Sequence, residues 1–90
     1  MNITYDSAKD ARNVIKHGVS LQLADLLEWA GLYAKVDSRV DYGELRIIGY
    51  APIGDRLYCV VFVDRDDSRR IISLRKANSK EVKYYVNIKT

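Results

Sequence analysis

The sequence predicts an α+β fold with a mainly antiparallel sheet, because helical patterns and hairpin-connected strands occupy separate parts of the chain. Residues 6–31 carry apolar side chains at helical spacing. Residues 33–75 alternate short apolar runs with turn-forming residues. A capped helical pattern then follows to about Ile88. We therefore expect two N-terminal helices, a sheet of about four strands and a C-terminal helix, in one domain over the 90 residues 1–90.

The two N-terminal helices are predicted from their caps. Asp6 can accept hydrogen bonds from the free amides of a first turn, and Gly18 can adopt the positive φ that ends a helix. Ser20 is the expected cap of a second short helix that ends at Gly31. Its expected apolar stripe consists of Leu23, Leu26, Leu27 and Ala30.

The strands are predicted from apolar runs bounded by turn residues. Turns are expected at Pro52–Asp55 and Asp66–Ser68, and residues 2–5 have an extended pattern. Asn78 or Ser79 is the expected cap of the last helix. The four expected strands cover residues 33–37, 44–50, 56–64 and 69–75.

Composition narrows the class of protein. Hydrophobic residues make up 48% of the chain and charged residues 30%, which is typical of a globular protein and not of a disordered one. No apolar run approaches the roughly 20 residues that a membrane span needs, so no membrane partner is expected. Cys59 is the only cysteine and cannot form an internal disulfide. A cytoplasmic location with a reducing environment fits this cysteine usage best.

The positive charge of the chain is concentrated in its last part. Residues 1–64 hold seven basic and nine acidic side chains, a net charge of −2. Residues 65–90 hold eight basic and three acidic side chains, a net charge of +5. A basic segment in a nearly balanced protein suggests a polyanionic partner such as nucleic acid, or an acidic protein. A solvated surface of ordinary lysines and arginines is the alternative.

Several kinds of enzyme are excluded by what the sequence lacks. It has no nucleotide-binding glycine motif, and one His with one Cys does not make a zinc site. No cofactor and no metal are therefore expected. What remains is a set of basic side chains with one histidine, which suits metal-free RNA cleavage. That reaction needs a base for the 2′-hydroxyl proton, cations for the charged phosphorane and an acid for the leaving oxygen.

Two motifs carry a resemblance to a known family. The first covers the predicted first helix and its end and reads Tyr5-Asp6-x-x-Lys9-x-x-x-Asn13-x-x-Lys16-His17-Gly18-Val19-Ser20. The second begins with Val60-Val61-Phe62 and Arg65, continues as Arg70-Ile71-Ile72-Ser73-Leu74-Arg75-Lys76-Ala77 and includes Glu81 and Tyr85. Together they resemble the BrnT family, the toxins of BrnT/BrnA type II toxin–antitoxin pairs.

The resemblance implies a RelE-like fold and a ribonuclease that inhibits translation. It also implies a partner, a BrnA-like antitoxin with a ribbon-helix-helix fold, which neutralises the toxin. Operator DNA would then be bound only through the antitoxin, and RNA would be the substrate. A catalytically inactive toxin homologue and a small RNA- or protein-binding module are the alternative functions.

The candidate catalytic residues are Arg65, Arg75, His17 and Tyr85. Arginine is suited to phosphate because its planar fork matches the phosphate oxygens. Arg65 and Arg75 lie on neighbouring strands of one predicted hairpin, so we expect their side chains to converge on one phosphate if the register allows. The candidate RNA-binding residues are Lys9, Lys16, Arg70 and Lys76.

Each of these side chains also has a structural interpretation. His17 can interact with the negative end of the first helix. Tyr85 can belong to the core with its hydroxyl at the rim. The arginines can be solvated charges at the sheet edge. Glu81 can form a capping box with Asn78, which competes with a role as a base.

Overall fold

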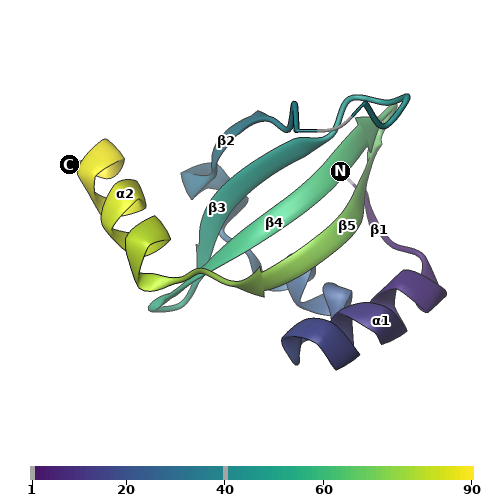
Figure 1. Cartoon of the computed structure of the whole chain (residues 1–90), viewed down its shortest axis with the longest axis horizontal. Coiled ribbons are helices and arrows are strands. Elements are labelled where there is room, and N and C mark those ends of the chain that lie inside the picture. The colour runs from purple at the N-terminus through teal and green to yellow at the C-terminus, as the bar shows by residue number, and fades with distance from the viewer. Residues whose placement is uncertain (1, 40) are drawn as a thin grey trace.

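A five-stranded sheet forms the body of the protein in our computed structural model, which describes residues 2–39 and 41–90 (Figure 1). The strand order is β1-β5-β4-β3-β2, and only the β1–β5 pair is parallel. The predicted α+β class with a mainly antiparallel sheet is therefore confirmed. In chain order the elements are β1 (Asn2–Thr4), α1 (Ser7–His17), η1 (Leu21–Leu26), η2 (Trp29–Gly31), β2 (Tyr33–Val36), β3 (Ile47–Ile53), β4 (Arg56–Arg65), β5 (Ser68–Lys76) and α2 (Ser79–Lys89).

Helix α1 begins and ends as the sequence predicts. The Asp6 carboxylate accepts a hydrogen bond from the Lys9 amide at 3.0 Å. Gly18 ends the helix with a φ of 75°, and its amide donates to the Val14 carbonyl. A glycine carries no Cβ that would oppose this left-handed conformation.

The prediction of a second N-terminal α-helix is wrong. This part of the chain forms two short 3-10 helices instead, η1 and η2. The buried side chains of this segment are Leu21, Ala24 and Leu27, which recur every three residues. This spacing matches the three residues per turn of a 3-10 helix. Leu26, which was predicted to belong to the buried stripe, is 61% exposed. Asp10 of α1 fixes the start of η1 by accepting hydrogen bonds from the Leu21 amide and the Ser20 hydroxyl.

The sheet has one strand more than predicted. Residues 2–4, expected only to be extended, pair in parallel with the start of β5, Asn2 with Ser68 and Thr4 with Arg70. A three-residue edge strand has too few residues to show an alternating pattern, so its partner could not be read from the sequence. The two hairpin turns fall within the predicted segments, but the first is shorter than predicted, because the strand predicted over residues 44–50 instead covers Ile47–Ile53. Asp66 adopts a φ of 54° in the second turn.

The core lies on one face of the sheet, beneath η1 and η2. Val60, Phe62, Ile71 and Leu74 supply it from β4 and β5, and all four are almost fully buried. Trp29 packs edge-on against Phe62, with 5.5 Å between the ring centroids. In Figure 1 these 3-10 turns lie behind the sheet, and the opposite face is turned toward the viewer. We call this opposite face the outer face.

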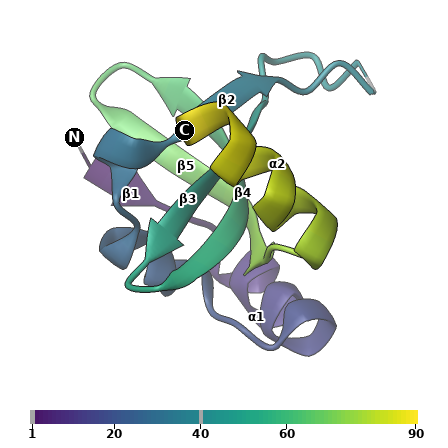
Figure 2. The same ribbon diagram turned by 90° about the vertical axis from the view of Figure 1, so that its left-hand side faces the viewer.

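The two helices border the outer face without covering it. Helix α1 lies along the β5 edge of the sheet, and α2 lies beyond the end at which β5 finishes (Figures 1 and 2). Helix α2 begins with a complete capping box between Asn78 and Glu81, as the sequence predicts. The described residues include no helix that is long and apolar enough to cross a membrane.

Candidate active site

The side chain of Asn13 attaches α1 to the exposed edge of β5. Its amide group donates to the Leu74 carbonyl at 2.7 Å and to the Val19 carbonyl at 2.9 Å, and its oxygen accepts from the Leu74 amide at 3.2 Å. Asn13 is buried. It thus replaces the strand that would otherwise pair with this part of β5, which β1 is too short to reach.

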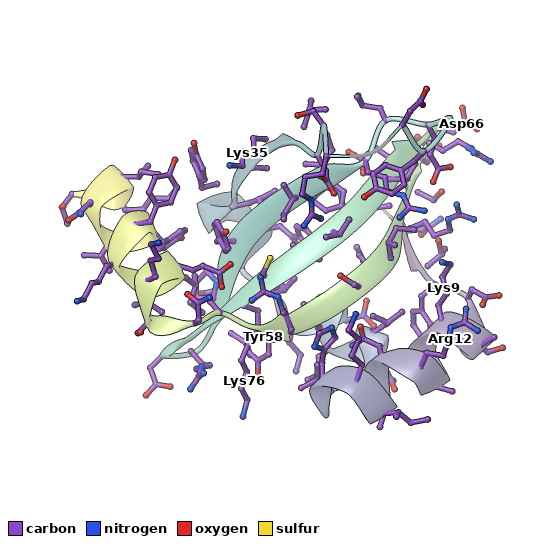
Figure 3. All side chains as sticks on the ribbon, viewed as in Figure 1. Lys9, Arg12, Lys35, Tyr58, Asp66 and Lys76 are labelled. Carbon is purple, nitrogen blue, oxygen red and sulfur yellow. The ribbon has the colours of Figure 1, made fainter. Side chains whose placement is uncertain are left out.

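One face of α1 is therefore held against β5. Positions three and four residues apart share a helix face, so Lys9, Lys16 and His17 lie on the same side of α1 as Asn13. They line a hollow of about 300 Å³ between α1 and β5, which we call the basic hollow. Its described lining includes no carboxylate and consists of Lys9, Arg12, Asn13, Lys16, His17, Ile72 and Ser73. Figure 3 shows Lys9 and Arg12 on α1.

The environment of His17 favours the neutral imidazole. Partial burial lowers the pKa of His17 below its ordinary value of 6.5, and the charges of Lys16 and Arg75 lower this pKa further. A neutral imidazole at pH 7 can accept a proton.

Arg75 is held by a two-point ion pair with Glu81 of α2. Its two terminal nitrogens each donate at 2.8 Å to one carboxylate oxygen of Glu81. The Arg75 side chain stays 34% exposed. A guanidinium has five N–H donors, and its Nε–H donates to no residue that the structure describes. Arg75 is thus fixed in place while part of its fork faces solvent.

Glu81 is a positioning carboxylate and not a base. Its oxygens accept from Arg75, from the Asn78 amide at 2.9 Å and from the Tyr50 hydroxyl at 3.1 Å. The Arg75 hydrogen bonds are the main cause that lowers the pKa of Glu81 to about 2. Burial is the main cause that raises the pKa of Tyr50 to about 12. At neutral pH, therefore, Glu81 stays charged and Tyr50 stays protonated.

The expected convergence of Arg65 and Arg75 on one phosphate is wrong. Arg65 pairs with Ser68 beside the hairpin turn, whereas Arg75 pairs with Cys59. Six residues of β4 separate Arg65 from Cys59, a distance of roughly 20 Å at about 3.3 Å per residue. The register of the hairpin places the two arginines at opposite ends of the outer face.

Arg70 lies close to Arg65 and far from Arg75. It pairs with Val63, two residues before Arg65 on β4. Glu44 lies between them, 3.5 Å from an Arg70 terminal nitrogen and 3.9 Å from an Arg65 terminal nitrogen. The candidate cations therefore fall into two groups on the outer face, one around Arg75 and one around Arg65.

The structure does not bring Lys76 or Tyr85 to either group. Lys76 pairs with Tyr58, a core residue, and so belongs to the other face of the sheet from Arg75. The Tyr85 hydroxyl donates to the carbonyl of Gly31 and lines a separate groove with Pro52 and Leu57. Its geometry fits the structural interpretation, in which Tyr85 attaches α2 to η2.

Tyr50 and Ser73 belong to the site and were missed from the sequence. Tyr50 pairs with Cys59, which pairs with Arg75, so the three side chains form one row across the outer face. Ser73 is the neighbour of Arg75 on this face and lines the basic hollow. These residues are neighbours because of how three strands pair, and the pairing register of the strands could not be predicted from the sequence.

These features define a class of protein. An exposed arginine locked by a carboxylate, a neutral histidine and a hollow lined by cations make a site for a phosphate-containing polyanion. The comparison with protein families makes this specific. The model of "Ribonuclease toxin, BrnT, of type II toxin-antitoxin system" matches residues 5–81, and the chain belongs to this family.

Family membership establishes the activity class and the partners. The protein is a ribonuclease toxin of a type II toxin–antitoxin system, with RNA as its substrate and a cognate antitoxin as its partner. The comparison with curated proteins finds no match.

Proposed function

We propose that this toxin cleaves RNA internally and without a metal ion, at the outer face between the basic hollow and Arg75. The proposal is supported by the fixed position of Arg75, together with a histidine in the basic hollow whose neutral form is favoured. Both side chains come from the segments in which the sequence resembles the family. Residues 1–90 would form a single toxin domain.

The chemistry follows from the two side chains. Neutral His17 accepts the proton of a 2′-hydroxyl, and the 2′ oxygen attacks the adjacent phosphorus. Arg75 stabilises the extra negative charge of the phosphorane. The bond from phosphorus to the 5′ oxygen breaks, and this oxygen takes a proton from water. The products are a 2′,3′-cyclic phosphate and a 5′-hydroxyl end.

The antitoxin would neutralise the toxin by occupying the outer face. A domain this small has little room for a long-range switch, so direct coverage of the site is the simplest mechanism. The basic segment 65–90, with its net charge of +5, favours an antitoxin surface with acidic and apolar residues. We propose that this antitoxin has a ribbon-helix-helix fold and alone contacts operator DNA.

Induced expression of the isolated gene tests the proposed function. We expect growth to slow and cellular RNA to be cleaved, and we expect translation to fall. Co-expression of the neighbouring antitoxin gene should restore growth. The purified toxin should cleave RNA equally well with EDTA present. Normal growth with intact RNA, at verified expression of folded protein, would identify an inactive homologue. Loss of cleavage in EDTA would contradict the metal-free mechanism.

A further inference from the structure

The second group of cations on the outer face has no role in the chemistry proposed above. Arg46, Arg65 and Arg70 all lie within 4 Å of the Glu44 carboxylate, and we call them the distal arginine cluster. They come from the segment before β3, the end of β4 and the start of β5. Three guanidinium groups share one carboxylate, which leaves a local net charge of +2.

All three contacts of the distal arginine cluster to Glu44 are loose, that of Arg46 at 3.5 Å included, in contrast to the other arginine ion pairs of the described residues. Arg39, Arg69 and Arg75 each form two-point ion pairs with oxygens at 2.7–2.9 Å. Arg65 and Arg70 approach Glu44 only to 3.9 and 3.5 Å, beyond the 2.7–2.9 Å of a charge-assisted hydrogen bond.

Exposure makes these two side chains available to a ligand. The Arg65 side chain is 70% exposed and the Arg70 side chain is 45% exposed. Arg46 is more enclosed, and its guanidinium lies over the Tyr42 ring at 4.0 Å. Arg46 is thus enclosed beside Glu44, although its Nε has no hydrogen-bond partner among the described residues, whereas Arg65 and Arg70 present their donors to solvent. The planar fork of each guanidinium matches the oxygens of a phosphate group, whereas an apolar ligand would leave these donors unpaired.

The position of the cluster relates it to the candidate active site. Arg70 and Arg65 lie on the same face as Arg75. Arg70 is opposite Val63, four positions beyond Cys59 on β4, and Arg65 is itself the β4 residue six positions beyond Cys59. These offsets correspond to roughly 13 and 20 Å along the strand. A stacked single strand rises about 3.4 Å per nucleotide, so up to about six nucleotides would span this distance. A more extended strand would need fewer.

From this arrangement we propose that the distal arginine cluster is a phosphate subsite, which binds the RNA backbone several nucleotides away from the cleaved bond. The inference rests on the proposed function, because it takes Arg75 as the position of cleavage. The subsite would set a minimum substrate length. RNA too short to reach from Arg75 to Arg65 would be cleaved without its help.

A length series of RNA tests the proposal. Initial rates would be measured for substrates from a dinucleotide to a decanucleotide, with the wild type, Arg65→Ala, Arg70→Ala and the double variant. We expect the substitutions to raise KM for the longest RNA about tenfold each, because each removes one phosphate contact, and to leave kcat unchanged. Cleavage of the dinucleotide should not change. The matched control is Arg56→Ala, an exposed arginine at the opposite end of β4.

A binding measurement keeps this proposal separate from the proposed function. Fluorescence anisotropy with a labelled 2′-O-methyl decanucleotide reports affinity without requiring cleavage. Each Arg→Ala substitution should weaken binding and reduce the slope of log affinity against log salt by about one. If the wild type binds this RNA but cleaves none, the proposed function fails and the subsite is still measured. If the wild type does not bind it, or if both variants bind like the wild type, the subsite is refuted.

Substitution of Glu44 should change RNA affinity in the opposite direction from substitution of the arginines. Glu44→Gln keeps a hydrogen-bond acceptor beside the arginines and raises the local net charge from +2 to +3. We expect tighter binding of the decanucleotide and no change for the dinucleotide. A cluster that merely stabilises the fold would show a lower melting temperature without tighter binding. Equal loss of kcat for short and long RNA in Arg65→Ala would place Arg65 at the cleaved bond and overturn the proposal.

Discussion

Arg70 and Arg75 lie on the same face of the sheet although five residues separate them along β5. Side chains alternate between the two faces of a regular strand, so an odd separation puts two residues on opposite faces. Here β5 contains an irregularity, because Val61 pairs with Ser73 while Phe62 pairs with Ile71. The extra residue, Ile72, reverses the alternation once.

This irregularity brings Arg70 and Arg75 together on the face of the sheet that we propose binds RNA. Ile71 and Leu74 on either side of it both point into the core, with no exposed area. Arg70 and Arg75 consequently both point away from the core. Ile72 itself lines the basic hollow. Bulges are often found next to active sites because they redirect a side chain.

Arg75 is the first position at which the mechanism can be tested. Arg75→Ala should lower the rate of RNA cleavage by about 10²–10³, because it removes one stabilising group from the transition state. Arg75→Lys should restore only part of this rate, since lysine keeps the charge but loses the planar fork. Initial cleavage rates with saturating RNA measure the effect.

Stability has to be followed in the same variants, because Arg75 also neutralises Glu81. Arg75→Ala leaves a partly buried carboxylate without its partner, so a lower melting temperature is expected. Arg75→Lys keeps a positive charge beside Glu81 and should melt closer to the wild type. Wild-type cleavage rates in a folded Arg75→Ala variant would place the active site elsewhere.

His17 should impose a pH dependence on cleavage. The reaction needs the neutral imidazole, so the rate should rise with pH and level off above the pKa of His17, which lies below 6.5. His17→Ala should lower the rate by about 10²–10⁴ and remove this acidic limb. A pH–rate profile between acidic and neutral pH measures both effects.

The structural interpretation of His17 predicts a different result. If His17 only interacts with the end of α1, His17→Ala would change the melting temperature and leave the pH–rate profile as it is in the wild type. Lys16→Ala serves as a comparison, because Lys16 also lies at the end of α1 and lowers the pKa of His17. In Lys16→Ala the acidic limb should move to higher pH.

The sequence predicted those parts of the fold that local chemistry determines. The Asp6 and Gly18 caps, the hairpin turns and the capping box of Asn78 with Glu81 depend on residues close together in the chain. The 3-10 turns and β1 were not predicted. Their conformation depends on Asp10 and on pairing with Ser68–Arg70, which are contacts between distant segments.

For the candidate site, the sequence indicated which types of residue to consider but not how they are arranged in space. His17 was selected because few other side chains could transfer a proton near neutral pH. Arg75 was selected because an arginine fork suits phosphate and because its segment resembles the family. Tyr50 could not be selected, since its place beside Arg75 depends on the pairing of three strands. The separation of Arg65 from Arg75 could have been predicted from the sequence. A two-residue turn at Asp66 and Asp67 pairs Arg65 with Ser68, far from Arg75.

Asn13 should contribute strongly to stability, because its side chain makes three hydrogen bonds in a buried position. Asn13→Ala leaves the amide and carbonyl of Leu74 without a partner in the described structure. We expect the free energy of unfolding to fall by about 2–4 kcal/mol, since each buried polar group left unpaired costs about 1–3 kcal/mol. Urea denaturation measures it, with exposed Asn87→Ala as the control. A loss below about 1 kcal/mol would show that water replaces these contacts.

Glu81 should make the stability of the protein depend on acid. The pKa of Glu81 is about 2 in the folded protein and near its ordinary value of 4.5 in the unfolded chain. The unfolded chain therefore binds more protons between these two values, and the ion pair's contribution is complete above about pH 4.5 and is lost as the pH falls toward 2. Glu81→Gln removes this contribution while keeping a residue that can complete the capping box with Asn78.

Urea denaturation of the wild type and Glu81→Gln between pH 2 and neutral pH measures the contribution. At neutral pH the variant should be less stable by roughly 1–3 kcal/mol, and the difference should shrink toward zero as the pH approaches about 2. Asp25→Asn, which neutralises an exposed carboxylate of η1, serves as the control variant. Glu81→Gln should also lower the RNA cleavage rate near neutral pH, because Arg75 is then held less firmly. A stability difference that stays constant across this range would mean that Glu81 stabilises α2 through its cap and not through its charge.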